Sequence, residues 1–389
     1  MGPLNPDPVF WAKRSVLVTG HTGFKGAWLC LWLARLGARV TGFALPPETL
    51  PSLFTLAGVA DRIDHRTGDV RDLDALRACA REAEPEVVLH LAAQALVRPS
   101  YEDPVGTYAS NVMGTVHLLE AVRACPSVRA AVIVTSDKAY ENREWPWAYR
   151  EDEAMGGRDP YSNSKGCAEL VTAAYRASFF SPQGRAEGTS AKHPARVASA
   201  RAGNVIGGGD WSLDRLVPDA VRAFSHAEVL EIRAPGAIRP WQHVLEPLSG
   251  YLRLAETLCG ESDASYAEAW NFGPAEEDCW PVADVVAKLA AGWGEGAAWR
   301  VSEGQHPHEA TFLKVDASKA RSRLGWDRRL RLGQALDWTG AWYRAQLRGA
   351  DAAGLCDAEI ARYEALAAGR ARGAAADGPL ASEVGRVVA

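Results

Sequence analysis

Residues 15–36, SVLVTGHTGFKGAWLCLWLARL, decide how the rest of the chain is interpreted. The stretch opens with a β-branched run, residues 16–19, which predicts a buried strand, and it ends in an apolar run long enough to predict a helix. Between them lie Gly20, Gly23 and Gly26. Glycines in such a turn permit positive φ and close approach of a pyrophosphate, to which the start of the helix offers free N–H groups. A glycine triplet alone is more often an ordinary turn, but between a strand and a helix at the start of a domain we interpret it as a dinucleotide site.

Composition excludes several classes of function. The chain has 389 residues, 47% of them hydrophobic, which is enough for one or two domains with a large core. A net charge of −5 gives no indication of a nucleic-acid partner, and no apolar run approaches the roughly 18 residues of a membrane span. The first ten residues lack the pattern of a secretory signal. Seven scattered cysteines without a C-x-x-C pair predict a reducing, cytoplasmic location, and nine histidines without metal-ligand spacing predict no metal site.

Hydrophobic periodicity predicts an α/β fold with a doubly wound parallel sheet of the Rossmann type. Strands alternate with helices at crossover spacing over the first half of the chain. The expected strands cover residues 16–19, 38–43, 62–67, 87–93, 132–134 and 197–202, with long helices over 105–122 and from about 161.

Beyond Gly207-Gly208-Gly209 this alternation loses its regularity, which predicts a smaller C-terminal substrate-binding lobe. We therefore divide the chain into an NAD-binding domain (10–207), the lobe (208–348, with some chain crossing back) and an Ala/Gly-rich tail (349–389). A surface loop is expected over 181–195, and a last helix near 357–366. Low complexity past Gly369 predicts disorder.

Tyr161 and Lys165 form the second chemical signal, because four residues on a predicted helix put both side chains on one face. A lysine beside a phenol favours the phenolate and lowers its pKa towards neutrality, which makes a general base. Such a pair alone is usually an ordinary surface pair. Ser136, at the end of the preceding strand, changes that interpretation, because its hydroxyl can bind the same substrate oxygen. Glycine turn, serine, tyrosine and lysine occur in the order that an active site needs.

With these residues in place, the sequence resembles the extended short-chain dehydrogenase/reductase family of nucleotide-sugar enzymes, and within it the CDP-glucose 4,6-dehydratases. The resemblance covers residues 14–343. It is carried by GHTGFKGAWL (20–29), PSLF (51–54), HLAAQALVRPSY (90–101), TSDKAYEN (135–142), YRED (149–152), DPYSNSKGCAEL (159–170), RAGNVIGGGDW (201–211), DRLVPD (214–219), RPWQHVLEPLSGYL (239–252) and HEATFLKVDASKA (308–320).

The resemblance implies a mechanism in which NAD⁺ takes a hydride from C4 of the sugar of CDP-glucose while Tyr161, helped by Lys165 and Ser136, removes the C4 hydroxyl proton. A base then removes the C5 proton, an acid protonates the C6 hydroxyl, and water leaves before the hydride returns to C6. Asp137 matches the C6 acid. Lys138 stands where related dehydratases place a glutamate as the C5 base, and a lysine acts as a base only when neutral. Without the neighbouring Ser136, Asp137 and Lys138 would be interpreted as a solvated loop pair.

The resemblance also implies the remaining binding residues and a homodimer, or a dimer of dimers, built on the helices near 105–122 and 161–175. Asp69, at the end of the third strand, caps a helix or contacts adenine, and His21 is expected to crowd the pyrophosphate. Ala44 occupies the position where an acidic residue normally binds the adenosine ribose. The expected cofactor residues are Gly20, Thr22, Gly23, Phe24, Lys25, Gly26, Asp69, Val70, Leu91, Ala92, Ala93, Gln94, Asn111, Thr135, Tyr161 and Lys165. The expected substrate residues are Arg98, Ser136, Asn204, Arg215, Arg239 and Glu309, with Lys314 a weaker candidate.

Two other functions compete with the dehydratase. A nucleotide-sugar 4-epimerase needs the same glycine turn, Ser136, Tyr161 and Lys165, but no acid/base pair after the serine, so Asp137 and Lys138 argue against it. A dehydratase for another nucleoside-diphosphate glucose shares every motif. A non-catalytic dinucleotide-binding protein has no need of the Tyr161–Lys165 pair.

Overall fold

A computed structural model describes residues 5–180, 193–260, 264–303 and 310–376. At its centre lies a seven-stranded sheet in the order β10-β6-β5-β4-β1-β2-β3, in which every pair of neighbours is parallel. Strand order reverses between β1 and β4, and in such sheets ligands bind outside the carboxyl ends of the strands at this point. The predicted doubly wound sheet is therefore confirmed. The strands are β1 (Ser15–Thr19), β2 (Arg39–Ala44), β3 (Asp64–Thr67), β4 (Val87–His90), β5 (Ala130–Val134), β6 (Arg196–Ala202) and β10 (Ala269–Phe272).

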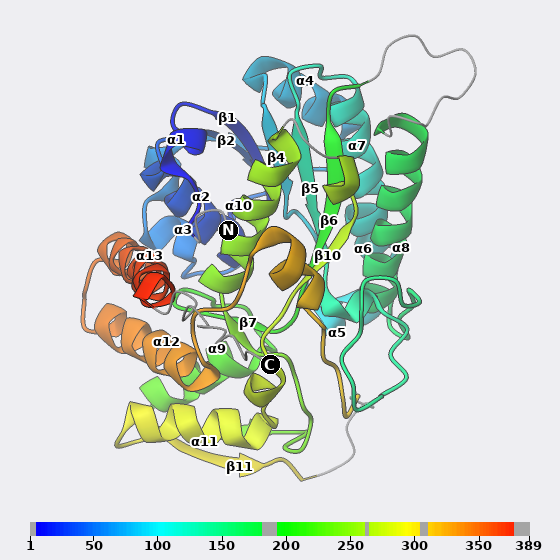
Figure 1. Cartoon of the computed structure of the whole chain (residues 1–389). Coiled ribbons are helices and arrows are strands. Elements are labelled where there is room, and N and C mark those ends of the chain that lie inside the picture. Colours follow the sequence, from blue (N-terminus) through cyan, green and yellow to red (C-terminus); the bar gives the residue numbers. More distant parts are fainter. Residues whose placement is uncertain (1–4, 181–192, 261–263, 304–309, 377–389) are drawn as a thin grey trace, which may run out of the picture.

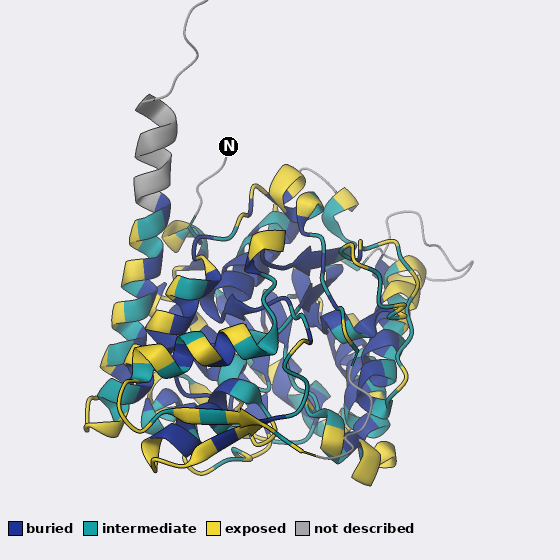
Figure 2. Cartoon of the chain, turned by 90° about the horizontal axis from the view of Figure 1, so that it is seen from below, coloured by how far each residue is buried: buried dark blue, intermediate teal, exposed yellow. Residues whose placement is uncertain are grey.

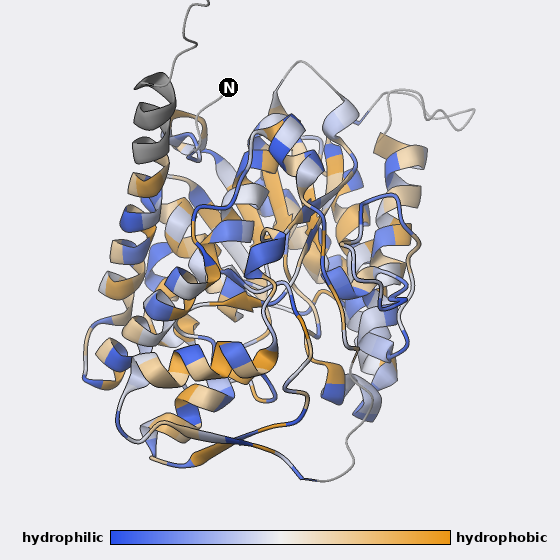
Figure 3. Cartoon of the chain, turned by 60° about the horizontal axis from the view of Figure 1, so that its bottom comes forward, coloured by the Kyte–Doolittle hydropathy of each residue, from blue (hydrophilic) through white to orange (hydrophobic). Residues whose placement is uncertain are grey.

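Helices cover both faces of the sheet (Figure 1). Alternate residues of β1 point to opposite faces, so Val16 and Val18 belong to one hydrophobic cluster and Leu17 to the other. The first cluster includes α2 (Phe24–Arg35) and α10 (Leu245–Cys259), and the second includes α4 (Leu73–Ala83), α7 (Gly114–Arg123) and the edge of α8 (Pro160–Tyr175). Burial on both faces explains why the central strands β1 and β5 are largely apolar (Figure 3).

Several element boundaries differ from those predicted. Arg62 ends the 3₁₀ turn η1 (Val59–Arg62), and the third strand begins only at Asp64. The fourth strand stops at His90, which leaves residues 91–93 as a loop. The helix expected over 105–122 consists of α6 (Pro104–Tyr108), the π turn η2 (Ala109–Met113) and α7, and it is preceded by α5 (Val97–Glu102). Residues 181–192 of the expected surface loop lie outside the described residues. Two short helices, α1 (Pro8–Trp11) and α3 (Leu53–Leu56), were not predicted.

The second half of the chain gathers beyond the carboxyl ends of the strands (Figure 1). It also returns to the sheet, because α10 packs on β5 and β6 and β10 forms the edge strand beside β6. Two small parallel sheets pair β7 (Val205–Ile206) with β9 (Gln242–His243), and β8 (Val229–Ile232) with β11 (Ala298–Val301). The helices of this part are α9 (Leu216–Ser225), α11 (Val282–Trp293) and α12 (Leu332–Leu347).

The last helix is longer than predicted: α13 runs over Ala352–Ala376. Cys356, Ile360 and Tyr363 are fully buried, and this spacing of three and four places them on one stripe that packs on the body of the protein (Figure 2). Helix therefore continues past Gly369, where disorder was predicted, and residues 377–389 of that stretch lie outside the described part. None of the helices in the described ranges combines the length and apolar character needed to cross a membrane.

Candidate active site

The glycine turn after β1 has the geometry that a dinucleotide requires. Gly20 adopts φ +75°, and a Cβ there would lie 2.5 Å from the backbone nitrogen of Ala92. A Cβ on Gly26 would lie 2.2 Å from the carbonyl oxygen of Gly20. Gly23 is the N-cap residue of α2 and supplies no side-chain cap, so the first N–H groups of that helix stay available to an anion. The residues around this turn therefore fit the pyrophosphate of NAD.

The sequence predicts that His21 crowds the pyrophosphate, but the structure turns its side chain away from the glycine turn. Its side chain is fully buried, and the ring lies where a Cβ on Gly42 of β2 would approach it to 2.5 Å. His21 Nε2 lies 2.7 Å from Nδ1 of His65, and burial together with that neighbour lowers the pKa of His21 to about 4. The imidazole is therefore a neutral packing group behind the turn. Thr22 likewise uses its hydroxyl within the protein, donating to the carbonyl of Leu45 at 2.8 Å.

The loops after β3 and β4 are held by their own hydrogen bonds. Asp69 accepts from the backbone N–H and guanidinium of Arg71, and these bonds lower its pKa. Asp72, not Asp69, caps α4, so the helix-cap interpretation of Asp69 is wrong. Asn111 Nδ2 donates to the carbonyl of Gln94 (2.9 Å) and to the Ser164 hydroxyl (2.8 Å), while its Oδ1 accepts from the Gln94 N–H (2.8 Å). Asn111 therefore connects the loop that contains Leu91, Ala92 and Ala93 to α8. In the loop after β3, the carbonyl of Val70 lies 3.0 Å from Nδ1 of His117.

The strand-end motif forms a tight turn. Ser136 is the N-cap residue of η3 (Asp137–Ala139), accepting from the Lys138 N–H at 3.2 Å and donating to Asp137 Oδ1 at 2.9 Å. Asp137 is 3% exposed, and its Oδ2 has no hydrogen-bond partner within the described residues. Burial raises the pKa of Asp137, against the opposing influence of Lys138 and Ser136. A buried carboxyl with a raised pKa is suited to donate a proton.

Tyr161 and Lys165 lie on the buried side of α8, which begins at Pro160 and is capped by Asp159. Burial raises the pKa of Tyr161, although the neighbouring Ser136 hydroxyl acts to lower it. The sequence predicts that the pKa of Tyr161 falls towards neutrality. In the structure it rises instead, because burial outweighs the influence of Ser136 and Arg215. Burial lowers the pKa of Lys165 to about 8, and the nearby Glu169 carboxylate opposes this effect.

Further cations converge on Asp137. The pKa of Lys25, in the first turn of α2, falls to about 7 because of burial and because Lys165 and Arg215 lie near it, while Asp137 acts to raise it. Arg215 is anchored by Asp210 at 2.9 Å, and its charge acts to lower the pKa of Tyr161. Arg239 acts to lower the pKa of Asp137. Lys25 and Arg239 therefore lie near the buried Asp137 carboxyl, and Arg215 lies near Tyr161 and Lys25.

Other predicted substrate residues do not join this cluster. Arg98 is exposed and pairs with Asp214 at 2.6 Å, and Lys314 pairs with Glu276 at 3.0 Å. Asn204, between β6 and β7, accepts the N–H of Gln242 through its backbone carbonyl. Glu309 lies outside the described residues. Among the residues that the structure describes, no group of three or more His, Cys, Asp or Glu is arranged to hold a metal ion.

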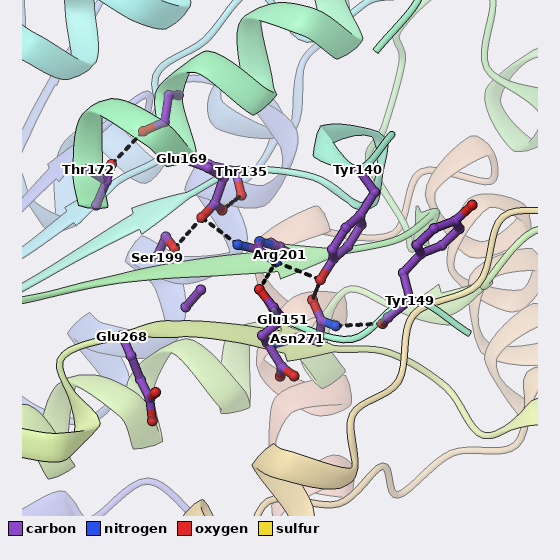
Figure 4. Close-up of polar contacts among 12 residues, drawn as sticks. Thr135, Tyr140, Tyr149, Glu151, Glu169, Thr172, Ser199, Arg201, Glu268 and Asn271 are labelled. Carbon is purple, nitrogen blue, oxygen red and sulfur yellow. Dashed lines mark hydrogen bonds and ion pairs between the residues drawn. The ribbon is translucent and has the colours of Figure 1, made fainter. Parts of the chain in front are cut away.

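A buried polar network next to the turn at Ser136 was not predicted (Figure 4). The Glu169 carboxylate accepts from the Thr135 and Ser199 hydroxyls and from Arg201, whose Nη2 lies 2.9 Å away. Arg201 Nη1 also donates to the Tyr140 hydroxyl at 2.7 Å. The network continues from Tyr140 to Asn271 and Tyr149. The available signal was the spacing of Glu169 four residues after Lys165, which puts both on one helical face.

Comparison with known proteins agrees with this geometry. A family model described as GDP-mannose 4,6 dehydratase matches residues 17–184. The CDP-glucose 4,6-dehydratase of Salmonella typhimurium (strain LT2) is 52% identical over 357 residues, covering 92% of this chain and 98% of that protein. MoeE5, solved in complex with UDP-glucose and NAD, has a TM-score of 0.68 and 25% identity, covering 86% of this chain and 99% of that one. The dTDP-glucose 4,6-dehydratase of Bacillus anthracis str. Ames, solved with NAD, has a TM-score of 0.70 at 20% identity, covering 86% and 98%.

A doubly wound sheet with a glycine turn after β1 and a Tyr–Lys pair beside a strand-end serine has the architecture of the extended short-chain dehydrogenases/reductases. Identity of 52% over nearly the whole of a characterised relative goes further. The chain belongs to the CDP-glucose 4,6-dehydratase family. Membership of this family confirms three predictions: the family itself, its hydro-lyase class and its use of NAD.

Proposed function

We propose that this protein converts CDP-glucose to CDP-4-keto-6-deoxyglucose, with NAD as its cofactor and loss of one water. The observation that carries the proposal is the Ser136-Asp137-Lys138 turn, whose serine and aspartate are buried beside Tyr161, in a chain of the CDP-glucose 4,6-dehydratase family. An oxidation at C4 needs only the serine, tyrosine and lysine. An acid and a second candidate base directly after the serine are what an elimination requires in addition.

The cofactor residues are proposed from the cradle around the glycine turn. The chemistry that NAD supplies when bound is acceptance of a hydride from C4 of the sugar and its return to C6. Thr135 offers the cofactor only its backbone, because its hydroxyl hydrogen bonds to Glu169. Lys165 is assigned to the ribose hydroxyls and to the phenolate. The full proposed set is Gly20, Thr22, Gly23, Phe24, Lys25, Gly26, Asp69, Val70, Leu91, Ala92, Ala93, Gln94, Asn111, Thr135, Tyr161 and Lys165.

Proton transfer at C4 is assigned to Tyr161. Its phenolate takes the C4 hydroxyl proton, and the Ser136 hydroxyl hydrogen bonds to the same oxygen as it becomes a carbonyl. The positive charge of Arg215 acts to lower the pKa of Tyr161 and so favours the phenolate against the burial that raises it. Lys165, one helical turn along α8, is assigned the same effect. Because the product keeps its 4-keto group, Tyr161 releases this proton to solvent and does not return it to the sugar.

Loss of water is assigned to Asp137 and Lys138. The C4 carbonyl acidifies the C5 hydrogen, which passes as a proton to neutral Lys138, while Asp137 gives its proton to the departing C6 hydroxyl. The raised pKa of Asp137 supports its role as an acid. When C6 is reduced, C5 regains a proton from Lys138, which returns to its neutral form. Asp137 regains from solvent the proton that it gave to the C6 hydroxyl, and this offsets the proton that Tyr161 took from the C4 hydroxyl, so the cycle is balanced.

The nucleotide diphosphate is assigned to the side of the cleft that carries Arg215 and Arg239, because guanidinium groups bind phosphate through paired hydrogen bonds. Arg98, Asn204 and Glu309 are proposed further from the reacting carbons, and Lys314 remains a weaker candidate. We also propose the domain division at 10–207, 208–348 and 349–389. The seven free cysteines are in keeping with a reducing, cytoplasmic compartment.

A homodimer is proposed through the face formed by α5, α6, η2 and α8. Four large apolar side chains on these elements are solvent-exposed in the single chain, with Val105 at 78%. A two-fold contact between copies of this face would bury them together. The four are Tyr101, Val105, Met113 and Leu170.

The test is incubation of the purified protein with NAD⁺ and, in parallel, CDP-, UDP-, GDP- and dTDP-glucose. Formation of a 4-keto-6-deoxy sugar, detected by its absorbance in alkali, is expected with CDP-glucose alone. Reaction with another of these sugars would overturn the base assignment. Interconversion of a glucose and a galactose nucleotide without loss of water would favour the 4-epimerase.

A further inference from the structure

The buried Glu169–Arg201 pair lies directly behind the catalytic residues, and the mechanism above does not use it. Both side chains are 4% exposed, and they are joined at 2.9 Å. A buried ion pair is costly to desolvate and is no evidence of stability by itself. A role for this pair must therefore be sought in what else its carboxylate binds, which is the hydroxyls of Thr135 and Ser199.

Glu169 connects the two elements that carry the catalytic groups. It lies one helical turn after Lys165 on α8, and its Oε1 accepts the hydroxyl of Thr135, the residue directly before Ser136. Its Oε2 accepts from Ser199 at 2.5 Å and from Arg201, both on β6. The carboxylate therefore fixes the end of β5 against α8, with the sheet behind it.

We propose that Glu169 is a positioning residue of the active site, holding Ser136 in register with Tyr161 and Lys165 through the Thr135 hydroxyl and keeping Lys165 charged. The inference rests on the proposed function, since it assigns a role to these groups in the same reaction. Arg201 holds the carboxylate ionised: burial acts to raise the pKa of Glu169, but Arg201 and the two hydroxyls bring it below its usual range.

Two other titratable neighbours of Lys165 supply no negative charge. Lys25 on α2 has its own pKa lowered to about 7, chiefly by burial and then by Lys165, and His90 at the end of β4 has its pKa lowered to about 3 by burial and by Lys165. The Glu169 carboxylate is the neighbour that acts to raise the pKa of Lys165. Without it, burial would remove the ammonium proton at a lower pH.

The chain offers a matched pair of variants to test positioning. Thr135→Val and Ser199→Ala each remove one hydroxyl donor from the same carboxylate, but only Thr135 is joined to Ser136. We expect Thr135→Val to lower kcat about tenfold or more with KM for CDP-glucose nearly unchanged, because small displacements of reacting groups are costly. Ser199→Ala should keep kcat within about twofold, and Thr135→Ser, which retains the hydroxyl, should restore most of the loss.

The outcomes separate this inference from the proposed function. A wild-type protein that does not dehydrate CDP-glucose refutes the function. An active wild type in which Thr135→Val and Ser199→Ala have equal kcat refutes the positioning role.

The pH profile tests the charge of Glu169. Glu169→Gln keeps the shape but not the charge, so the pH above which kcat/KM declines should fall relative to wild type and Ser199→Ala. An alkaline limb that does not move would refute the electrostatic role. If loss of the Arg201 partner prevents Glu169→Gln from folding, Thr135→Val and its rescue by Thr135→Ser still decide the positioning role.

Discussion

Removal of a single hydroxyl from each of two buried tyrosines should separate catalysis from stability. Tyr161→Phe keeps the ring and deletes the group assigned to proton transfer at C4. General acid–base groups contribute about 10²–10⁴ in rate, or about 3–5 kcal/mol of transition-state stabilisation. The free energy of unfolding should change by about 1 kcal/mol or less, because only one hydrogen-bonding hydroxyl is lost and the ring remains packed.

Tyr363→Phe is the matched control on α13. The Tyr363 hydroxyl donates to Oε2 of the buried Glu246 at 2.7 Å, while Oε1 accepts the backbone N–H groups of Arg329 and Leu330. Deleting that donor should cost about 1.5–3 kcal/mol of stability, the range for a hydrogen bond to a charged group, and leave kcat close to wild type.

Denaturant unfolding and steady-state turnover of CDP-glucose measure both effects in both variants. Near-normal turnover in Tyr161→Phe, or a larger loss of stability there than in Tyr363→Phe, would make Tyr161 a structural residue and refute its assignment as the base.

Three further predictions follow from the site. Lys138→Ala should stop both the loss of water and the exchange of the C5 hydrogen with solvent deuterium, while enzyme-bound NADH accumulates. Asp137→Asn should retain the C5 exchange. Unimpaired C5 exchange in Lys138→Ala would show that this lysine is not the base. Burial lowers the pKa of Lys165 to about 8, so its ammonium loses a proton as the pH rises through that value, and kcat/KM should decline there; a profile that stays level across this range would contradict the requirement for a charged lysine. Val105→Asp should convert the proposed dimer to a monomer in sedimentation at micromolar concentration, while Val229→Asp, at a similarly exposed apolar position on β8, should not; sedimentation of the wild type as a monomer would rule out this interface.

The features that the sequence predicted well are local. The glycine turn, the cap of α8 and the Tyr161–Lys165 spacing depend on residues a few positions apart, so their backbone geometry follows from the residue types themselves. Family resemblance then brought the distant Arg215 and Arg239 to the same site, and the structure has both acting electrostatically on Tyr161 or Asp137.

The features that were missed depend on the packing of distant segments. His21 turns inward because Gly42, on a different strand, leaves room for its ring. The pKa of Tyr161 rises because burial, which no spacing reveals, outweighs its favourable partners. Arg201 lies 32 positions from Glu169 in the sequence, and the packing of α8 against β6 brings them together. Likewise, β10 is a short strand whose place at the edge of the sheet follows from tertiary contacts.

The most direct test of the dehydratase assignment follows a deuterium atom through one turnover. CDP-glucose carrying deuterium at C4 is incubated with the protein and NAD⁺ in ordinary water, and the product is analysed by mass spectrometry and NMR. The mechanism predicts a product lighter by one water, with the deuterium at C6. A product of unchanged mass with the deuterium still at C4 would contradict it and identify an epimerase.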